Sequence, residues 1–475
     1  MLFIGGLVIC IIVFILSSYS SLCSVKPRAS YVYYSTTFLF LFTIGNWFIH
    51  PFSNYPMLPY PLTWYLSLCV YVYCAWMMTG KIKMLRILRF CFMYPAIVYF
   101  TATFFSLCLS PLFYFFPSIV SRVCLAISLI ALHQTTSVKK ELVTINITKP
   151  HTPTSFTRSF FSFFPQGLTR TSLPSKTIIL DRSEDNERKC LRVIQLSDLH
   201  LSCLMTPKKA HKLVRNAVSL DPDLVVITGD VINPEMSRLT GAVSYVFGPL
   251  VALKGKVFAV LGNNDLNVSY LKNVYKSLGI TLLRDREAIV ETPAGPVQIL
   301  GADCRVFNPQ SAIRRLVLKF PPIENHFRML LIHDPEICKH LPDLKLADPT
   351  DRINAIRIAQ KHFAEGYIDS SIGPDTVDIN RTPGDEGHGL DLILAGGTNG
   401  GHINLVPFCI NRSFDVIRWL TGNPTRNLWK KGGNHLFIHR GLGVFGFPLR
   451  LNVPPEFCFI KVYYDEETDT QKKIS

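Results

Sequence analysis

Five short polar motifs in the second half of the chain contain residue types that bind divalent metal ions. Each motif follows an apolar run typical of a buried strand. The motifs are Ser197-Asp198-Leu199-His200, Gly229-Asp230, Gly262-Asn263-Asn264-Asp265, His333-Asp334-Pro335 and Gly396-Gly397-Thr398-Asn399-Gly400-Gly401. Because parallel strands of an open α/β sheet bring their carboxyl ends to the edge where ligands bind, we expect the five motifs to converge there. That edge is the candidate active site.

The residue types favour a two-metal site for phosphoester cleavage. Two divalent ions held by Asp, His and Asn can bridge an attacking hydroxide and a phosphoryl oxygen. Asp198 and His200 are two positions apart, so one loop can present both to the same ion. Asp230 has two carboxylate oxygens for bridging two ions, and Asn263 and His333 would serve the second ion. A single such residue is more often a turn or cap residue, so the prediction depends on their order at successive strand ends.

The elements around these motifs follow a β-α-β order. Strands are expected at 142–147 and 191–196, and before each later motif. The segment after the first motif predicts a helix, in which Thr206 caps, Pro207 occupies the first turn, and apolar residues repeat at helical spacing. These apolar residues are Ala210, Leu213, Val214, Ala217 and Val218. A strand, a helix and a further strand indicate an α/β fold with a covered sheet.

The motifs resemble those of the calcineurin-like metallophosphoesterase superfamily, in particular its membrane-anchored branch, which includes UDP-2,3-diacylglucosamine pyrophosphatases. Residues 436–443, 448–451 and 454–456 also resemble the carboxy-terminal strand pair and loop of that branch. The resemblance covers roughly residues 190–465, insertions aside. It implies a calcineurin-like four-layer α/β/β/α sandwich, preceded here by a helical transmembrane bundle, and divalent ions as cofactor.

The chain departs from the family pattern at three positions, and each departure removes a His. Asn264 stands where the family has a His that acts as general acid, next to Asp265. Gly397 and Asn399 stand where the family has metal-binding His residues. Asn399 can offer an amide oxygen, which is a weaker ligand. His402 is the nearest replacement, although a His in this position is more often an ordinary loop residue. The resemblance therefore implies Asn264 and Asp265 as catalytic residues. It implies one or two divalent ions, Mn, Mg, Fe or Zn. The implied metal ligands are Asp198, His200, Asp230, Asn263, His333 and Asn399.

The missing general acid restricts the substrate class. Such a loss typically costs about 100- to 10,000-fold in rate. A phosphate leaving group, with a second pKa of about 6, needs little help from an acid. A pyrophosphate bond of a nucleotide-linked lipid is therefore favoured over a simple sugar phosphate, and the possible lipid substrates are a phospholipid or a nucleotide-linked lipid. The alternative is a catalytically impaired pseudo-phosphoesterase that serves as a membrane-tethered binding or scaffold module.

Residues 1–140 have the composition of a transmembrane region. They contain no Asp or Glu and nine Lys or Arg, and so supply +9 of the chain's net charge of +15. The modest charge of the remainder argues against a nucleic-acid partner. Apolar stretches long enough for a bilayer of about 30 Å lie at 2–23, 31–49, 60–79, 91–110 and 112–132. We therefore expect about five helices and a lipid bilayer as partner.

Basic residues alternate between the turns of this region. Lys and Arg occur near 26–28, 81–89 and 139–140, whereas 50–59 and 110–116 have none. The positive-inside rule then predicts a multi-pass protein with its large domain in the cytoplasm. The fifth span contains Pro117 and Arg122, and without it the domain would lie on the other face.

The remaining segments complete the predicted organisation. Residues 141–190 are a linker with an insertion in which five Phe alternate with basic residues; it suits either the headgroup interface or packing on the domain. Residues 191–465 are the metallophosphoesterase-like domain, with a polar insertion at about 345–388, and 466–475 are a polar tail. No Cys-x-x-Cys pair occurs among the 13 Cys, so neither a disulfide framework nor a zinc knuckle is indicated.

Overall fold

In the computed structural model the described residues form a group of helices, two large sheets with their covering helices, and the loops between them. The described residues are 60–79, 86–109, 112, 115–148, 168–172, 190–233, 241–265, 267–303, 313, 315–317, 319–340, 390–405, 414–415, 425–431 and 434–465. The predicted insertion at 345–388, the predicted tail at 466–475 and the Phe-rich part of 141–190 lie outside them.

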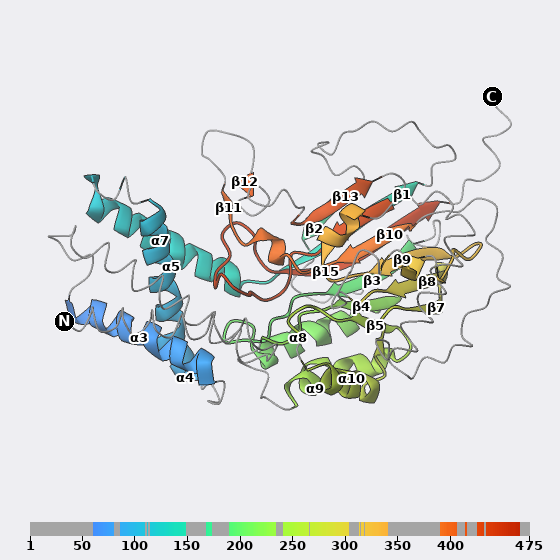
Figure 1. Ribbon diagram of the computed structural model, residues 1–475, viewed down its shortest axis with the longest axis horizontal. Coiled ribbons are helices and arrows are strands. Elements are labelled where there is room, and N and C mark those ends of the chain that lie inside the picture. Colours follow the sequence, from blue (N-terminus) through green and yellow to red (C-terminus); the bar gives the residue numbers. More distant parts are fainter. Residues whose placement is uncertain are drawn as a thin grey trace, which may run out of the picture.

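The first sheet has seven strands in the order β2-β1-β15-β3-β4-β5-β6 (Figure 1). Strands β3 to β6 are parallel, whereas β15 runs antiparallel to β3 and parallel to β1. The strands are β1 (Lys139–Thr148), β2 (Leu168–Ser172), β3 (Cys190–Leu196), β4 (Leu224–Thr228), β5 (Val257–Val260), β6 (Thr281–Leu282) and β15 (Glu456–Asp465). Every residue of β3, β4 and β5 is buried, as expected for strands covered on both faces.

The second sheet has six strands in the order β13-β14-β10-β9-β8-β7. Strands β8, β9, β10 and β14 are parallel, and the edge strands β7 and β13 are antiparallel to their neighbours. The strands are β7 (Arg286–Thr292), β8 (Gly295–Gly301), β9 (Phe327–Leu331), β10 (Leu392–Ala395), β13 (Asn427–Lys431) and β14 (Asn434–Ile438). A separate pair is formed by β11 (Asn404–Leu405) and β12 (Phe414–Asp415).

The two sheets face each other across a continuous apolar core. Val193 and Val226 from the first sheet belong to the same buried cluster as Ile299, Met329 and Leu394 from the second. The other face of the first sheet is covered by α8 (Pro207–Val218), α9 (Ala242–Phe247), η4 (Gly248–Leu253) and α10 (Val268–Ser277). These mixed α/β sheets are consistent with the fold that the resemblance implies.

The helix predicted after the first motif is confirmed. It begins after Thr206, whose side chain accepts a hydrogen bond from the Lys209 N–H, and Pro207 is its first residue. Its buried residues are Ala210, Leu213, Val214 and Ala217. The helix therefore returns the chain to β4 and places the second motif beside the first.

Matching Arg–Asp pairs fix the register of the central strands in both sheets. The Arg192 N–H donates to the Asp223 carboxylate at 2.9 Å, and the Asp223 N–H donates back to the Arg192 carbonyl at 2.9 Å. Arg328 and Asp391 repeat both bonds in the second sheet, at 2.8 and 2.9 Å. Since both pairs lie at the amino ends of β3 and β9, they help to align the strand ends that carry the motifs.

The helices before the first sheet form a separate group at one end of the molecule (Figure 1). They are α3 (Tyr60–Thr79), α4 (Arg86–Leu88), η1 (Arg89–Met93), α5 (Tyr94–Cys108) and α7 (Pro117–Thr136). Within the described residues one helix, over Ser118–Thr136, is long and apolar enough to cross a membrane. The five-span bundle is therefore not established, and the spans predicted at 2–23 and 31–49 lie outside the described part of the chain.

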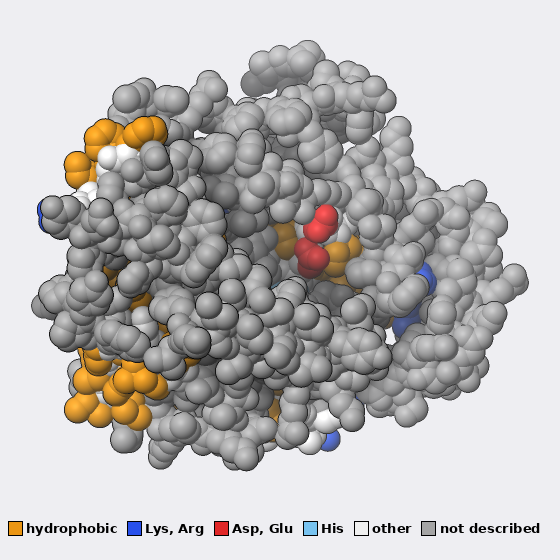
Figure 2. Space-filling model, turned by 60° about the vertical axis from the view of Figure 1, so that its left-hand side comes forward, with side chains coloured by type: hydrophobic (Ala, Val, Ile, Leu, Met, Phe, Trp, Pro, Cys, Tyr) orange, Lys and Arg blue, Asp and Glu red, His pale blue; other side chains and the backbone are white. Residues whose placement is uncertain are grey.

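Many apolar side chains of these helices are uncovered. They include Leu68, Phe90, Ile119, Val123 and Ile130. Figure 2 shows hydrophobic side chains in patches along one side of the molecule, and acidic side chains in a hollow further along the surface. Only 28% of the candidate span is buried, so most of its apolar surface has no protein partner among the described residues.

The inner faces of the helices pack directly on two loops of the α/β domain. Val70, Ile97 and Ala131 share a buried cluster with Leu204 and Leu449. The carboxyl end of α7 adds hydrogen bonds that connect it to the domain, three of them 2.9 Å or shorter. These three run from Lys209 Nζ to the Thr136 carbonyl at 2.9 Å, from the Arg450 N–H to Thr135 Oγ1 at 2.7 Å, and from the Asn452 N–H to Gln134 Oε1 at 2.6 Å.

Candidate metal centre

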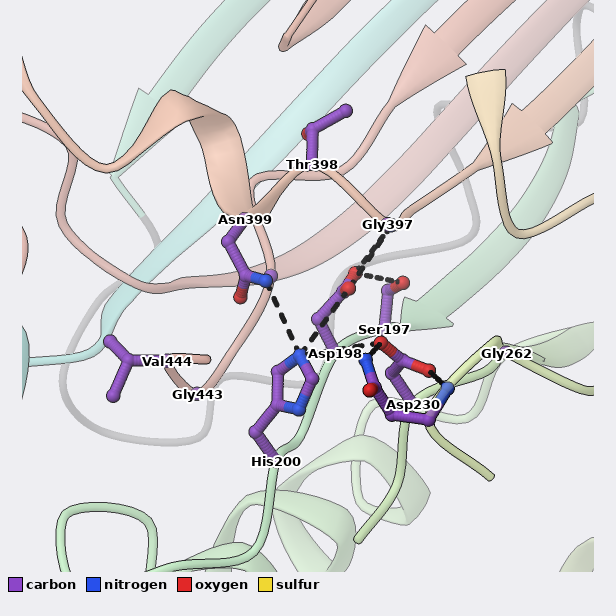
Figure 3. Close-up of polar contacts among 12 residues, drawn as sticks. Ser197, Asp198, His200, Asp230, Gly262, Gly397, Thr398, Asn399, Gly443 and Val444 are labelled. Atoms are coloured by element: carbon purple, nitrogen blue, oxygen red, sulfur yellow. Dashed lines mark hydrogen bonds and ion pairs between the residues drawn. The ribbon is translucent and has the colours of Figure 1, made fainter. Parts of the chain in front are cut away.

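The loops after β3 and β4 bring three potential metal ligands together. One side-chain ligand atom each from Asp198, His200 and Asp230 lies within 4.8 Å of the others, and all three residues are buried. Their φ values are 50°, 42° and 55°, a left-handed conformation that is uncommon for residues other than glycine and is often found at functional sites. Figure 3 shows the three side chains pointing toward one another.

His200 is held with its Nε2 atom toward the two carboxylates. Asn233 Nδ2 donates to the Val444 carbonyl at 3.4 Å, so Asn233 Oδ1 accepts from His200 Nδ1 at 2.8 Å. His200 Nε2 then lies 3.8 Å from Asp198 Oδ1 and 3.5 Å from Asp230 Oδ2. Orientation of a metal-binding imidazole through its other nitrogen is common at metal sites.

His333 faces the other side of Asp230. Its Nδ1 donates to the Thr228 carbonyl at 2.7 Å, and its Nε2 lies 3.3 Å from Asp230 Oδ2 and 3.1 Å from Asn263 Oδ1. Burial by itself opposes charge on both groups, but their mutual attraction raises the pKa of His333 to about 10 and lowers the pKa of Asp230. The same attraction holds the His333 ring beside Asp230.

In the third motif, Asn264 lies at the site and Asp265 lies behind it. Asn264 donates to both oxygens of Asp230, from its backbone N at 2.8 Å and from Nδ2 at 2.7 Å. Asp265 is fully buried and accepts from the backbone N–H groups of Asp230, Val231 and Gly262. Burial, and then the charge of Asp230, raises the pKa of Asp265 to about 6. Asp265 thus holds the second and third loops together, and Asn264 borders the reacting groups.

Gly397 contributes its backbone to the site. Its N–H lies 3.0 Å from both oxygens of Asp198. A Cβ at this position would lie 3.2 Å from His333 Nε2. A side chain here would therefore start beside the proposed ligands of the second ion. With glycine, that group keeps Asp230, Asn263 and His333 only.

Asn399 lies at the site, but its oxygen is turned away from the other ligands. Asn399 Oδ1 accepts from Arg450 Nη2 at 3.1 Å, and Asn399 Nδ2 faces His200 Nε2 at 3.3 Å. This geometry differs from the expectation that the amide oxygen would point toward a metal ion. His402 donates from Nδ1 to the Leu449 carbonyl at 3.3 Å, and burial followed by the charge of Arg450 lowers its pKa to about 3.

Three residues near the site were missed by the sequence reasoning. Asn233 orients His200, Arg450 holds Asn399, and Phe445 stacks on the His200 ring at 5.2 Å between centroids. The Pro448–Leu451 segment was noted only for its resemblance to the family. An isolated Asn or Phe in a loop carries no pattern by which its partner could be found.

The donor set fits a divalent cation. Buried carboxylates and imidazole nitrogens with their lone pairs directed inward suit Mn²⁺, Fe²⁺ or Zn²⁺, and the oxygen donors also suit Mg²⁺. Asp198, His200, Asp230 and His333 are buried, whereas Asn263 and Gly397 are exposed and form the open side of the site. A ligand would therefore reach the metal ligands past Asn263 and Gly397.

We expect weak or single-ion occupancy. Gly397 offers no ligand to the second ion, and the oxygen of Asn399 is engaged by Arg450. Elemental analysis of desalted protein should find well under two ions per chain. Two retained ions would contradict this expectation and would mean that water, His402 or a residue of the 345–388 insertion completes the coordination.

Comparisons with known proteins place the same segment in one family. Residues 191–398 match the family described as calcineurin-like phosphoesterase. The chain is 28% identical over 298 residues to the uncharacterised metallophosphoesterase YkoQ of Bacillus subtilis, which covers 60% of this chain and 89% of that protein. It is 25% identical over 295 residues to the UDP-2,3-diacylglucosamine pyrophosphatase LpxG of Chlamydia muridarum, covering 58% and 84%. A Danio rerio transmembrane protein with a metallophosphoesterase domain is 29% identical over 133 residues, or 27% of this chain and 30% of that protein.

Proposed function

Because this chain carries a calcineurin-like phosphoesterase domain, a family that uses divalent metal ions, we propose that it is a membrane-anchored hydrolase of lipid-linked phosphoesters or pyrophosphates. The proposed substrate has a phosphate-containing headgroup and an apolar part that stays with the bilayer. A phospholipid or a nucleotide-linked lipid fits this description, and the relative from Chlamydia is named for a substrate of the second kind.

The observation that carries the proposal is the short connection between the metal ligands and the apolar helices. Phe445 stacks on the His200 imidazole with an interplanar angle of 12°. Two residues further on, Phe447 lies 5.5 Å from the ring of Phe104 and 6.2 Å from that of Phe105, both on α5. A headgroup at the metal ligands would therefore lie close to helices whose outer surface is apolar.

The chemistry follows from the residues around Asp230. When bound, divalent ions would polarise a phosphoryl oxygen and lower the pKa of a bound water. Asp198, His200, Asp230, Asn263 and His333 would hold them. Asn264 Nδ2 donates a hydrogen bond but has no proton to transfer, so the leaving group must depart without a general acid. A pyrophosphate bond meets this requirement because phosphate is a good leaving group.

A non-catalytic role is the second candidate, favoured by the geometry at Asn399. Three His positions of the family are replaced, and the one replacement that carries an amide oxygen directs that oxygen to Arg450. A domain of this kind would act as a membrane-tethered binding or scaffold module. The same buried site would then bind a phosphate-containing ligand without cleaving it.

An assay with three substrates distinguishes hydrolase from scaffold. Nitrophenyl phosphate ester, a UDP-linked lipid and an alkyl phosphate would be incubated with the purified chain and Mn²⁺ or Mg²⁺. A hydrolase should cleave the first two faster than the third. No turnover by the native chain, and none after His is introduced at positions 264, 397 and 399 together, would exclude the hydrolase and leave the scaffold.

We further propose that the domain lies in the cytoplasm, as the alternating Lys and Arg of residues 1–140 predict. A reporter that is active only outside the cytoplasm should stay inactive when fused to the carboxyl terminus. The same reporter fused within the turn at 50–59, which lacks basic residues, is the matched control and should be active. An active reporter at the carboxyl terminus would refute the five-span topology.

A further inference from the structure

The side-chain amide of Asn399 has one orientation compatible with its neighbours, and in that orientation its nitrogen points toward His200 (Figure 3). Arg450 Nη2 lies 3.1 Å from the Asn399 side chain. Because a guanidinium group donates hydrogen bonds and never accepts them, the atom that faces it must be the amide oxygen. The amide nitrogen is then the atom that lies 3.3 Å from His200 Nε2.

His200 Nε2 is a hydrogen-bond acceptor, because the neighbours of His200 also fix which of its ring nitrogens carries the proton. The Val444 carbonyl accepts from Asn233 Nδ2, which leaves Asn233 Oδ1 to accept from His200 Nδ1. The proton of the neutral imidazole is therefore on Nδ1, and the lone pair is on Nε2. Asn399 Nδ2 thus donates to the lone pair that a metal ion would need.

Arg450 is itself fixed, so Asn399 cannot turn without breaking a network. The side chain of Arg450 is fully buried and donates to the carbonyl oxygens of Gly443, Asn399 and Arg440. Its backbone N–H donates to Thr135 at the end of α7. The guanidinium therefore connects the loop that carries Asn399 to the carboxy-terminal loop, and the backbone of Arg450 connects that loop to the candidate membrane helix.

We infer that Asn399 is a hydrogen-bonding cap on His200, held in place by Arg450, and that it competes with a divalent ion for His200 Nε2. The inference rests on the proposed function in one respect, namely that the site binds a divalent ion. The inference reverses the expected effect of replacing Asn399 on the affinity for a divalent ion. A metal ligand weakens ion binding when it is removed, whereas removal of a competing cap strengthens it.

The test is Mn²⁺ binding by calorimetry on the full chain in detergent. Asn399→Ala should bind Mn²⁺ about two- to tenfold more tightly than the native chain, the range that corresponds to one released hydrogen bond. Asn263→Ala is the matched control, since it removes a proposed ligand by the same truncation and should weaken binding. Weaker binding by Asn399→Ala would overturn the inference.

A second measurement does not require any ion to bind. In metal-free protein labelled with ¹⁵N-histidine, Asn399→Ala should shift the His200 Nε2 resonance toward that of an unbonded imidazole nitrogen. Arg450→Lys keeps the positive charge but loses the several N–H donors of the guanidinium group. It should shift the same resonance in the same direction. An unchanged resonance in Asn399→Ala would refute the cap. Absence of Mn²⁺ binding in every variant would instead count against the proposed function, and the spectra would still decide the role of Asn399.

Discussion

Replacing Asp230 with Asn should lower any hydrolytic rate on the order of 1,000-fold, since an ion's contribution of several kcal/mol would be lost. Oδ2 of Asp230 faces His333 Nε2 at 3.3 Å, His200 Nε2 at 3.5 Å and Asn264 Nδ2 at 2.7 Å. The substitution preserves size but removes the carboxylate charge that would neutralise bound ions. It also brings an amide N–H₂ group where a bridging oxygen is needed. The rate would be measured with the nitrophenyl ester at saturating Mn²⁺.

Asp221→Asn is the matched control for this result. Asp221 also has a positive φ, 48°, but it is exposed in the turn before β4, away from the strand ends that carry the site. Asn is well tolerated in that conformation, so the control should retain the native rate. Thermal unfolding of both variants separates a lost site from a lost fold. A folded Asp230→Asn variant with native activity would contradict the bridging role.

Replacing Asn264 with His should raise the rate, by roughly 100-fold for an alkyl phosphate and much less for a pyrophosphate. The backbone N–H of residue 264 donates to Asp230 Oδ1 and is unaffected by the change, so the new imidazole would start from an anchored position. A protonated His can donate to an alkoxide leaving group, which Asn cannot. The measurement compares kcat for the two substrates at several pH values.

The pH profile identifies the origin of the gain. If the new His acts as a general acid, the gain should fall as the pH rises through its pKa, because the proton to be donated is lost. Asn264→Gln is the control, since it alters the side chain without adding a titratable group, and it should show no gain. An equal gain for both leaving groups would argue for improved binding and against acid catalysis.

The sequence was sufficient to predict which loops converge, because strand periodicity and polar motifs at strand ends are local signals. Asp198 and Asp230 follow completely buried strands, and the helix between them has a recognisable cap. The direction of the Asn399 amide could not be predicted, since it is set by Arg450, which is 51 positions further along the chain. The role of Asp265 was equally hidden. Its three backbone partners come from two loops, and only their folded positions make it a support for the site.

The position of β15 has a consequence for how the protein is made. β15 is the last described strand, yet it lies between β1 and β3 in the sheet and pairs with β1 over its whole length. Arg440 strengthens the same junction through ion pairs with Glu141 of β1, at 2.6 Å, and with Glu456 of β15.

During synthesis, β1 emerges directly after α7, whereas its partner strand is completed more than 300 residues later. At about 5–20 residues per second, the edges of β1 and β3 that β15 will join wait for their partner for roughly 15 to 60 seconds, although β1 can already pair with β2 and β3 with β4. Unpaired strand edges are templates for aggregation, so the nascent chain is most vulnerable in this interval. β15, the last strand among the described residues, therefore completes the sheet by joining β1 to β3.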